Sequence, residues 1–300
     1  VMVIPIAVAI VVLQIWGSYR LIMKIFKWLT LSLFAYVIAA FLAKPDWWAV
    51  AKATFVPQIS FTSEYITTIV AILGTTISPY LFFWEASEEV EEEKSEGRTK
   101  LSERKGATDI EIKKEKIDTI VGMLFCNVVF YFVILAAGAT LHVSGKTDIQ
   151  SATDAAQALR PLAGNFATVL FGIGLIGAGL LAVPVLTGSA AYAVAETFGW
   201  PSGLDEKPRH AKKFYGVIAA STIIGVLIDF VGINPISALF WTAVINGVVA
   251  PPLLVVVMLV ANNKKVMGKR TNGLFTNIFG WLATAVMFAA AIAMFATWSQ

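Results

Sequence analysis

Uncharged stretches alternate with short charged segments along the whole chain. An α-helix rises about 1.5 Å per residue, so about 20 apolar residues cross the roughly 30 Å hydrocarbon core of a bilayer. Two uncharged stretches, 28–43 and 214–228, are shorter and can cross if their flanking lysines extend to the membrane surface. The longer uncharged stretches are 1–19, 65–84, 119–145, 161–195, 230–263 and 271–300. The pattern predicts an all-α, polytopic transmembrane protein.

The charged segments complete this organisation. When the eight stretches are numbered in chain order, most Lys and Arg residues fall in the connections after the first, third, fifth and seventh. The positive-inside rule therefore places these connections in the cytoplasm. The segment 92–116 is the one long polar connection, and we expect it to be a cytoplasmic loop within a single transmembrane domain, residues 1–300. The eight predicted spans are 1–19, 28–43, 65–91, 117–142, 161–196, 213–229, 235–261 and 274–298.

Composition excludes several classes of protein. The chain is 57% hydrophobic and 14% charged, whereas soluble proteins carry about 25% charged residues. A soluble enzyme, a nucleic-acid-binding module and a disordered tail are therefore excluded. With Cys126 as the single cysteine and two His, we expect neither a disulfide within the chain nor a bound cofactor. The chain begins inside an apolar stretch at Val1, so we expect a fragment whose upstream helices are missing.

The third span is interrupted near its middle by a run of hydroxyl residues and a proline. Pro79 cannot donate a helical hydrogen bond and clashes with the carbonyl one turn before it, which releases carbonyls around Thr75. In lipid, a released carbonyl is tolerated only where it is buried or lines a polar cavity. Transporters build cation sites from such broken helices. The alternative is a simple proline kink in which Ser and Thr side chains bond to the backbone locally. The sequence leaves both interpretations open.

Polar residues beside this interruption extend the candidate site. Glu85 lies about 9 Å beyond Pro79 along the helix axis, still inside the bilayer, where a carboxylate indicates function. Glu88 and Glu89 continue an acidic stripe toward the cytoplasm. We expect the glutamates of residues 88–93 to meet water, and the stripe to attract divalent cations. In the seventh span, Asn246 is a further candidate contributor to the site.

Two segments resemble a known family of transporters. Residues 74–92, GTTISPYLFFWEASEEVEE, resemble the sixth transmembrane helix of the natural resistance-associated macrophage protein (NRAMP) divalent-metal transporters and look most like their magnesium-transporting branch. Residues 158–180 are similar to the eighth helix of that family. The resemblance covers nearly the whole chain. It implies a leucine-transporter-like fold of two inverted repeats, of which this chain holds helices four to eleven and lacks the first three.

The resemblance also implies the residues of the metal site. The family's metal-binding Met-Pro-His corresponds to Ser78, Pro79 and Tyr80, and its carbonyl ligand corresponds to Thr75; Thr76 completes the candidate set, and Gly74 and Pro79 mark the helix break. The Asp-Pro-Gly-Asn motif of the family's first helix has no counterpart here. A hydroxyl in place of the Met thioether favours hard ions such as Mg²⁺ and Mn²⁺. Tyr80 replaces a titratable His, so we expect transport that is not coupled to protons.

These features lead to one expected function and two alternatives. We expect a monomeric transporter of Mg²⁺, and also of Mn²⁺, that works by alternating access in the plasma membrane of a prokaryotic cell. The first alternative is a carrier of amino acids or other organic solutes with the same fold, which the acidic stripe disfavours for anionic solutes. The second is a membrane enzyme, for which no intramembrane His, Asp pair or Ser/Lys dyad is present in the sequence. We expect no enzymatic activity and no nucleic-acid partner.

Overall fold

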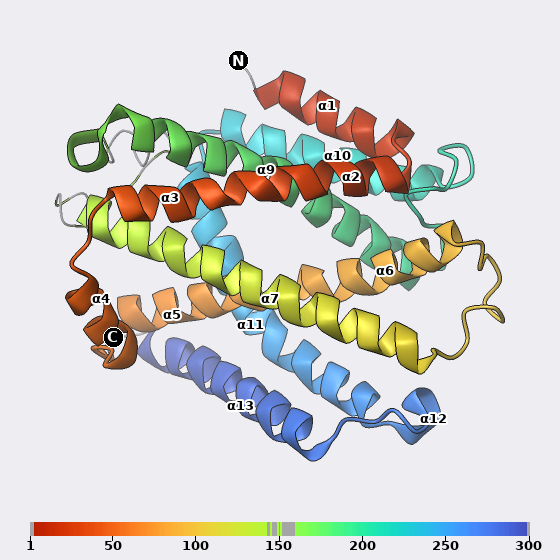
Figure 1. Ribbon diagram of the computed structural model, residues 1–300. Coiled ribbons are helices and arrows are strands. Elements are labelled where there is room, and N and C mark those ends of the chain that lie inside the picture. Colours follow the sequence, from red (N-terminus) through yellow and green to blue (C-terminus); the bar gives the residue numbers. More distant parts are fainter. Residues whose placement is uncertain (1–2, 143–144, 146–148, 150, 152–159, 299–300) are drawn as a thin grey trace. The chain divides into compact units, whose positions relative to one another are not determined.

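A computed structural model describes residues 3–142, 145, 149, 151 and 160–298 (Figure 1). The helices are α1 (Val3–Trp16), α2 (Tyr19–Thr30), η1 (Leu31–Leu33), α3 (Phe34–Leu42), α4 (Trp47–Phe55), α5 (Ser63–Thr76), α6 (Pro79–Ser95), α7 (Asp109–Ala137), η2 (Gly138–His142), α9 (Arg160–Thr197), α10 (Lys212–Phe230), α11 (Pro235–Ala261), α12 (Lys264–Met267) and α13 (Leu274–Thr297). Every regular element in these residues is helical, which confirms the all-α prediction.

Helix length and composition confirm an integral membrane protein. Among the described residues, five helical stretches are long and apolar enough to cross a bilayer: Tyr19–Leu42, Asp109–Ala137, Val169–Thr197, Pro235–Ala261 and Leu274–Thr297. α1 is apolar but shorter. Helical structure lies at each of the eight predicted spans, and the third span is made of two helices, α5 and α6.

Both helices that flank the polar connection extend into it. α6 continues to Ser95 and α7 begins at Asp109, so residues 96–108 form the turn between them rather than the predicted 92–116. α7 begins there because Thr108 and Glu111 form a capping box, in which each side chain bonds the backbone amide of the other residue. In the span similar to the family's eighth helix, Ala158 and Leu159 lie outside the described residues, and Arg160 opens α9.

The chain divides into two compact units. Residues 1–55 and 83–235 form the larger unit, and residues 56–82 and 236–300 form the smaller unit. The boundary falls inside α6, between Phe82 and Phe83.

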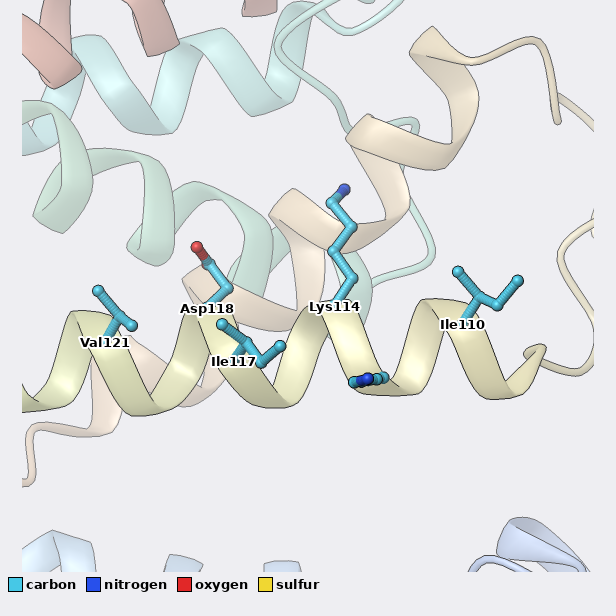
Figure 2. Close-up of a pocket in the computed structure, with 6 residues that line it drawn as sticks. Ile110, Lys114, Ile117, Asp118 and Val121 are labelled. Atoms are coloured by element: carbon cyan, nitrogen blue, oxygen red, sulfur yellow. The ribbon is translucent and has the colours of Figure 1, made fainter.

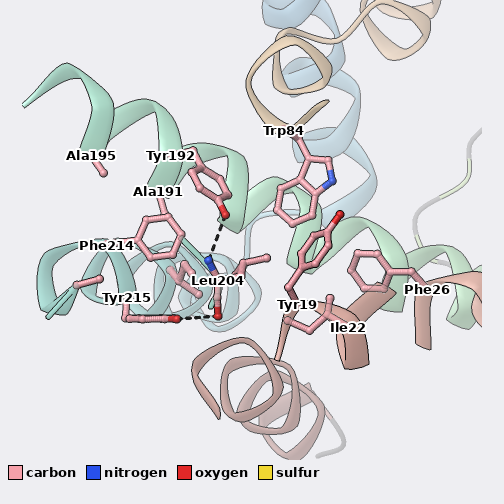
Figure 3. Packing of buried hydrophobic residues seen from close by; sticks show 12 residues of the cluster. Tyr19, Ile22, Phe26, Trp84, Ala191, Tyr192, Ala195, Leu204, Phe214 and Tyr215 are labelled. Carbon is pink, nitrogen blue, oxygen red and sulfur yellow. Dashed lines mark hydrogen bonds between the residues drawn. The ribbon is translucent and has the colours of Figure 1, made fainter. Parts of the chain in front are cut away.

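Aromatic packing builds the core of the larger unit (Figure 3). Tyr192 on α9 and Phe214 on α10 meet with ring centroids 4.9 Å apart, and Trp84 on α6 lies 6.2 Å from Tyr192. The hydroxyl of Tyr192 accepts a hydrogen bond from the amide of Leu204 at 3.2 Å. The hydroxyl of Tyr215 donates to the carbonyl of Glu206 at 2.9 Å. These polar ends of buried rings fix the α9–α10 connection (residues 198–211) to both helices.

The same connection is held by α2 and α6. The carboxylate of Asp205 accepts from the amide of Tyr19 at 2.8 Å, at the start of α2. The carboxylate of Glu91, on α6, is 2% exposed and accepts from the backbone amide of Asp205. Lys94 pairs with Glu91 at 3.0 Å. Four helices of the larger unit are therefore tied to one connection by hydrogen bonds.

The smaller unit is built around α5, α11 and α13. Its core holds Ile66 and Val70 from α5, Val244 from α11 and Met294 from α13. Each of these side chains is less than a tenth exposed. α5 thereby carries the first half of the broken span into the core of this unit.

Candidate functional site

The break between α5 and α6 consists of two residues. α5 ends at Thr76, Ile77 leaves the helical region with φ −120° and ψ 69°, and Pro79 opens α6 after Ser78. The residue before a proline is excluded from the helical conformation by the proline ring, whereas proline itself fits the first position of a helix. The span is therefore interrupted at Ile77 and Ser78.

The prediction that the helix already unwinds at Gly74 is wrong. Gly74, Thr75 and Thr76 are helical, and the amide of Ile77 donates to the carbonyl of Leu73 at 2.9 Å, so helical bonding continues through both threonines. The physical reason is that Pro79 removes only its own amide, whose helical partner is the carbonyl four residues earlier. The amide of Ile77 is intact and continues the helical bonding.

Three hydroxyl groups line the end of α5, and each donates to a carbonyl one turn before it. The hydroxyl of Thr75 donates to Ala71 at 2.9 Å and that of Thr76 to Leu73 at 2.9 Å. The hydroxyl of Ser78, which is 2% exposed, lies 2.6 Å from the carbonyl oxygen of Gly74 and 3.1 Å from that of Thr75.

The Ser78 hydroxyl thus caps the last turn of α5. Its nearer acceptor is the carbonyl of Gly74, and its second is the carbonyl of Thr75, which the missing amide of Pro79 would have bonded. This is the local bonding expected of a proline kink, the alternative that the sequence left open. It does not remove the hydroxyls as ligands, because an oxygen that donates its hydrogen still has two lone pairs. Thr75, Thr76 and Ser78 therefore bring three hard oxygen donors to one helix end, where the partial negative charge of the helix dipole also favours a cation.

Gly74 has a packing role rather than a role in breaking the helix. A Cβ atom at Gly74 would overlap the carbonyl oxygen of Ala243 and the amide nitrogen of Gly247 on α11. A Cβ atom at Gly247 would likewise overlap the carbonyl oxygen of Val70 on α5. The two helices thus touch through their backbones. Asn246, the half-buried neighbour of Gly247, is consequently held on α11 at the level of Gly74.

Enlarging Gly74 tests this contact. We expect Gly74→Ala to lower the free energy of unfolding by about 1–3 kcal/mol, because the added methyl group must push α11 away. Gly122→Ala on α7 is the matched control, since a Cβ atom there meets no neighbour within 4 Å and alanine favours the helix. Thermal unfolding in detergent measures both variants. Equal melting temperatures for Gly74→Ala and Gly122→Ala would contradict the backbone contact.

The remaining candidates differ in burial. Tyr80 is half-buried near the start of α6. In the larger unit, Glu85 and Glu89 are exposed, whereas Glu88 is half-buried. Within the described residues, one carboxylate oxygen of Glu88 is buried and accepts no hydrogen bond.

Glu91 corrects the expectation that the acidic stripe beyond Glu88 meets water. It is the most buried of the glutamates on α6, and its partners are Lys94 and the amide of Asp205. The sequence offers one signal for this, a lysine three residues after the glutamate on the same helix face. The second partner, the amide from the α9–α10 connection, has no local sequence signal.

Elsewhere in the described structure we find a shallow hollow on α7 and no cluster of metal-ligating side chains. A hollow along α7 is lined by Ile110, Lys113, Lys114, Ile117, Asp118 and Val121 (Figure 2). All of these side chains come from one helix, so the hollow is a surface feature rather than an enclosed cavity. In the described part of the chain, no three His, Cys, Asp or Glu side chains gather into a metal-ligand group.

Comparisons with known proteins identify the family. The sequence model of the Nramp family, described as natural resistance-associated macrophage protein-like, matches residues 1–297. A protein of Caldanaerobacter subterraneus named divalent metal cation transporter MntH is 27% identical over 96% of this chain and 64% of its own length. Proteins with the same name from Clostridium acetobutylicum and Bacillus subtilis are 28% and 26% identical, over 88% and 94% of this chain and 57% and 62% of their own lengths.

This chain therefore spans less than two thirds of the length of these relatives. The family match, by contrast, covers the chain almost from end to end. The chain belongs to the natural resistance-associated macrophage protein-like family.

Proposed function

We propose that the full-length protein transports divalent metal cations across the membrane by alternating access, with the ion held at the break between α5 and α6. The observation that carries the proposal is the two-residue break at Ile77 and Ser78, beside which three hydroxyl groups point back along α5. The names of the relatives, divalent metal cation transporters, support the same class of substrate.

The donor set favours a hard ion. The metal ligands in this proposal are the oxygen atoms of Thr75, Thr76, Ser78 and Tyr80, with the amide of Asn246 as a further donor. Mg²⁺ prefers oxygen ligands and keeps several of its waters, and a buried serine hydroxyl can hydrogen-bond such a water. Mg²⁺ is therefore the proposed substrate and Mn²⁺ the second. They are cargo, and no resident cofactor is proposed.

The acidic residues of α6 are proposed to serve the pathway of the ion rather than its binding site. Glu85 and Glu89 are exposed and can attract a hydrated cation. Glu88 has a buried oxygen with an unused lone pair. Because Tyr80 stands where a His would titrate near neutral pH, transport is proposed to be independent of protons.

The alternatives are less well supported. A carrier of amino acids needs a helix N-terminus open to the substrate carboxylate, and three nearby glutamates on α6 oppose a negative charge. Membership of a transporter family argues against a membrane enzyme. The bacterial origin of the relatives supports a prokaryotic plasma membrane. A monomer is proposed as the working unit, which light scattering of the purified protein would test.

Uptake into proteoliposomes tests the transport proposal. The full-length protein should take up radiolabelled Mg²⁺ and Mn²⁺ in a saturable manner, and empty liposomes should not. A pH-sensitive dye inside the vesicles should show no acidification that depends on metal. Uptake of amino acids without uptake of metal would contradict the proposal, and metal-dependent acidification that is lost in Glu85→Gln would show that protons are coupled through Glu85.

A further inference from the structure

The connection between α11 and α13 concentrates positive charge. This α11–α13 turn (residues 262–273) carries Lys264, Lys265, Lys269 and Arg270, and all four residues are exposed. From residue 230 to residue 300 the sequence contains no Asp or Glu. The turn is therefore a local excess of positive charge in a part of the chain that has no acidic residue.

Hydrogen bonds connect this turn to the helices that flank it. The side chain of Asn263 accepts from the amide of Lys265 at 2.9 Å and caps the single turn of α12. The side-chain amide of Asn262, at the end of α11, donates to Asn277 of α13 at 2.7 Å. The backbone that carries the four cations is thus bonded to the helix that follows it and to its own cap.

The other long charged connection, residues 96–108, contains acidic as well as basic residues. Its Arg98 pairs with Glu93, Glu96 and Glu111 at 2.9–3.1 Å, so that its charge is neutralised within the chain. None of the ion pairs among the described residues involves Lys264, Lys265 or Lys269 of the α11–α13 turn. Among the described residues, no acidic side chain neutralises the charge of these lysines.

The position of the turn indicates which kind of partner its cations meet. α11 and α13 are both long and apolar enough to span a bilayer, and they end at the turn, so the turn lies at the membrane surface. Apolar side chains stand beside the cations: Val266 is 63% exposed, Leu274 73% and Phe275 77%. Cations next to exposed apolar groups at the end of a membrane helix fit the boundary between anionic headgroups and acyl chains.

We propose that the α11–α13 turn binds the headgroups of anionic phospholipids in the leaflet that it faces. Its four cations contact the phosphate and other negative groups, and Val266, Leu274 and Phe275 enter the acyl boundary. The bound lipids fix the depth of the α11–α13 hairpin, which packs against α5 through α13. This interaction is independent of the identity of the transported solute.

Selective quenching by brominated lipids tests the proposal directly. A fluorescent amino acid replaces Thr271 in the full-length protein, which is reconstituted with phosphatidylcholine and phosphatidylglycerol, one of them brominated. At equal mole fraction, brominated phosphatidylglycerol should quench about threefold more than brominated phosphatidylcholine, because a basic residue near the surface attracts anionic lipid. Addition of 0.5 M salt should reduce the preference, since it shortens the Debye length to about 4 Å.

Two variants with equal loss of charge complete the test. In the turn variant, Lys264, Lys265, Lys269 and Arg270 are each replaced by Gln, and the quenching preference should disappear. In the control variant, Lys100, Lys105, Lys113 and Lys116 are each replaced by Gln, and the preference should remain. All exchanged residues of the turn are exposed, and melting temperatures establish that both variants are folded. Equal quenching by the two lipids in the unmodified turn, or a preference that survives in the turn variant, would overturn the proposal.

Discussion

Replacing Ser78 by Met is expected to lower Mg²⁺ transport about tenfold and to raise Cd²⁺ transport. Ser78 is buried at the break, and its hydroxyl bonds the carbonyls of Gly74 and Thr75. A thioether cannot donate a hydrogen bond, and its bulk takes the space of a metal-bound water. One lost buried hydrogen bond costs about 1–3 kcal/mol, and about 1.4 kcal/mol corresponds to tenfold. A soft ion that has lost its water gains a direct sulfur ligand instead.

Two further variants separate selectivity from damage to the fold. Ser78→Thr keeps the hydroxyl and should retain the preference for Mg²⁺. Ser78→Ala removes the hydroxyl without adding sulfur, so Mg²⁺ transport should fall while Cd²⁺ transport should not rise. Uptake of both ions by all variants in proteoliposomes gives the measurement. An unchanged ratio of Mg²⁺ to Cd²⁺ transport in Ser78→Met would show that Ser78 does not face the ion.

Among the variants considered for stability, Glu91→Ala should lower the free energy of unfolding the most. Breaking a buried ion pair costs about 3–5 kcal/mol, and the partial exposure of Lys94 reduces this to about 2–4 kcal/mol for Glu91→Ala. The amide of Asp205 would also lose its acceptor. Each kcal/mol shifts the melting temperature by about 2–4 °C in domains of 150–250 residues.

An exposed glutamate of the same region provides the control. Glu96 is 52% exposed and pairs with Arg98, so Glu96→Ala should change stability by less than about 1 kcal/mol. Thermal unfolding of both variants at one scan rate gives the comparison. If Glu91→Ala and Glu96→Ala have the same melting temperature, the α9–α10 connection is not held by Glu91.

Local chemistry explains what the sequence could predict. Pro79 restricts the residue before it whatever the rest of the chain does, so the break could be placed within a few residues. The lengths of the uncharged stretches predicted the spanning helices, because a helix must be long enough to cross a bilayer of fixed thickness. The capping box of Thr108 and Glu111 is also local, and it could have moved the predicted start of α7 from residue 117 to Asp109.

Remote contacts explain what the sequence could not predict. Gly74 was expected to be part of the break. Instead, its lack of a side chain lets the backbone of α5 contact the backbone of α11 at Gly247, which lies far along the chain. Glu91 was expected to meet water, but the α9–α10 connection, which lies far along the chain, packs against its carboxylate at Gly203. The hydroxyls of Thr75 and Thr76 also bond backward along α5, which depends on side-chain rotamers that no spacing encodes.

The transported ion is expected at the break between α5 and α6. Anomalous diffraction from crystals of the full-length protein soaked in Mn²⁺ tests this most directly, because Mn²⁺ scatters anomalously and stands in for Mg²⁺. A peak is expected within about 2.0–2.6 Å of an oxygen atom of Thr75, Thr76 or Ser78, or one bridging water away. Strong Mn²⁺ peaks only at other places, with none at the break, would show that the break does not hold the ion.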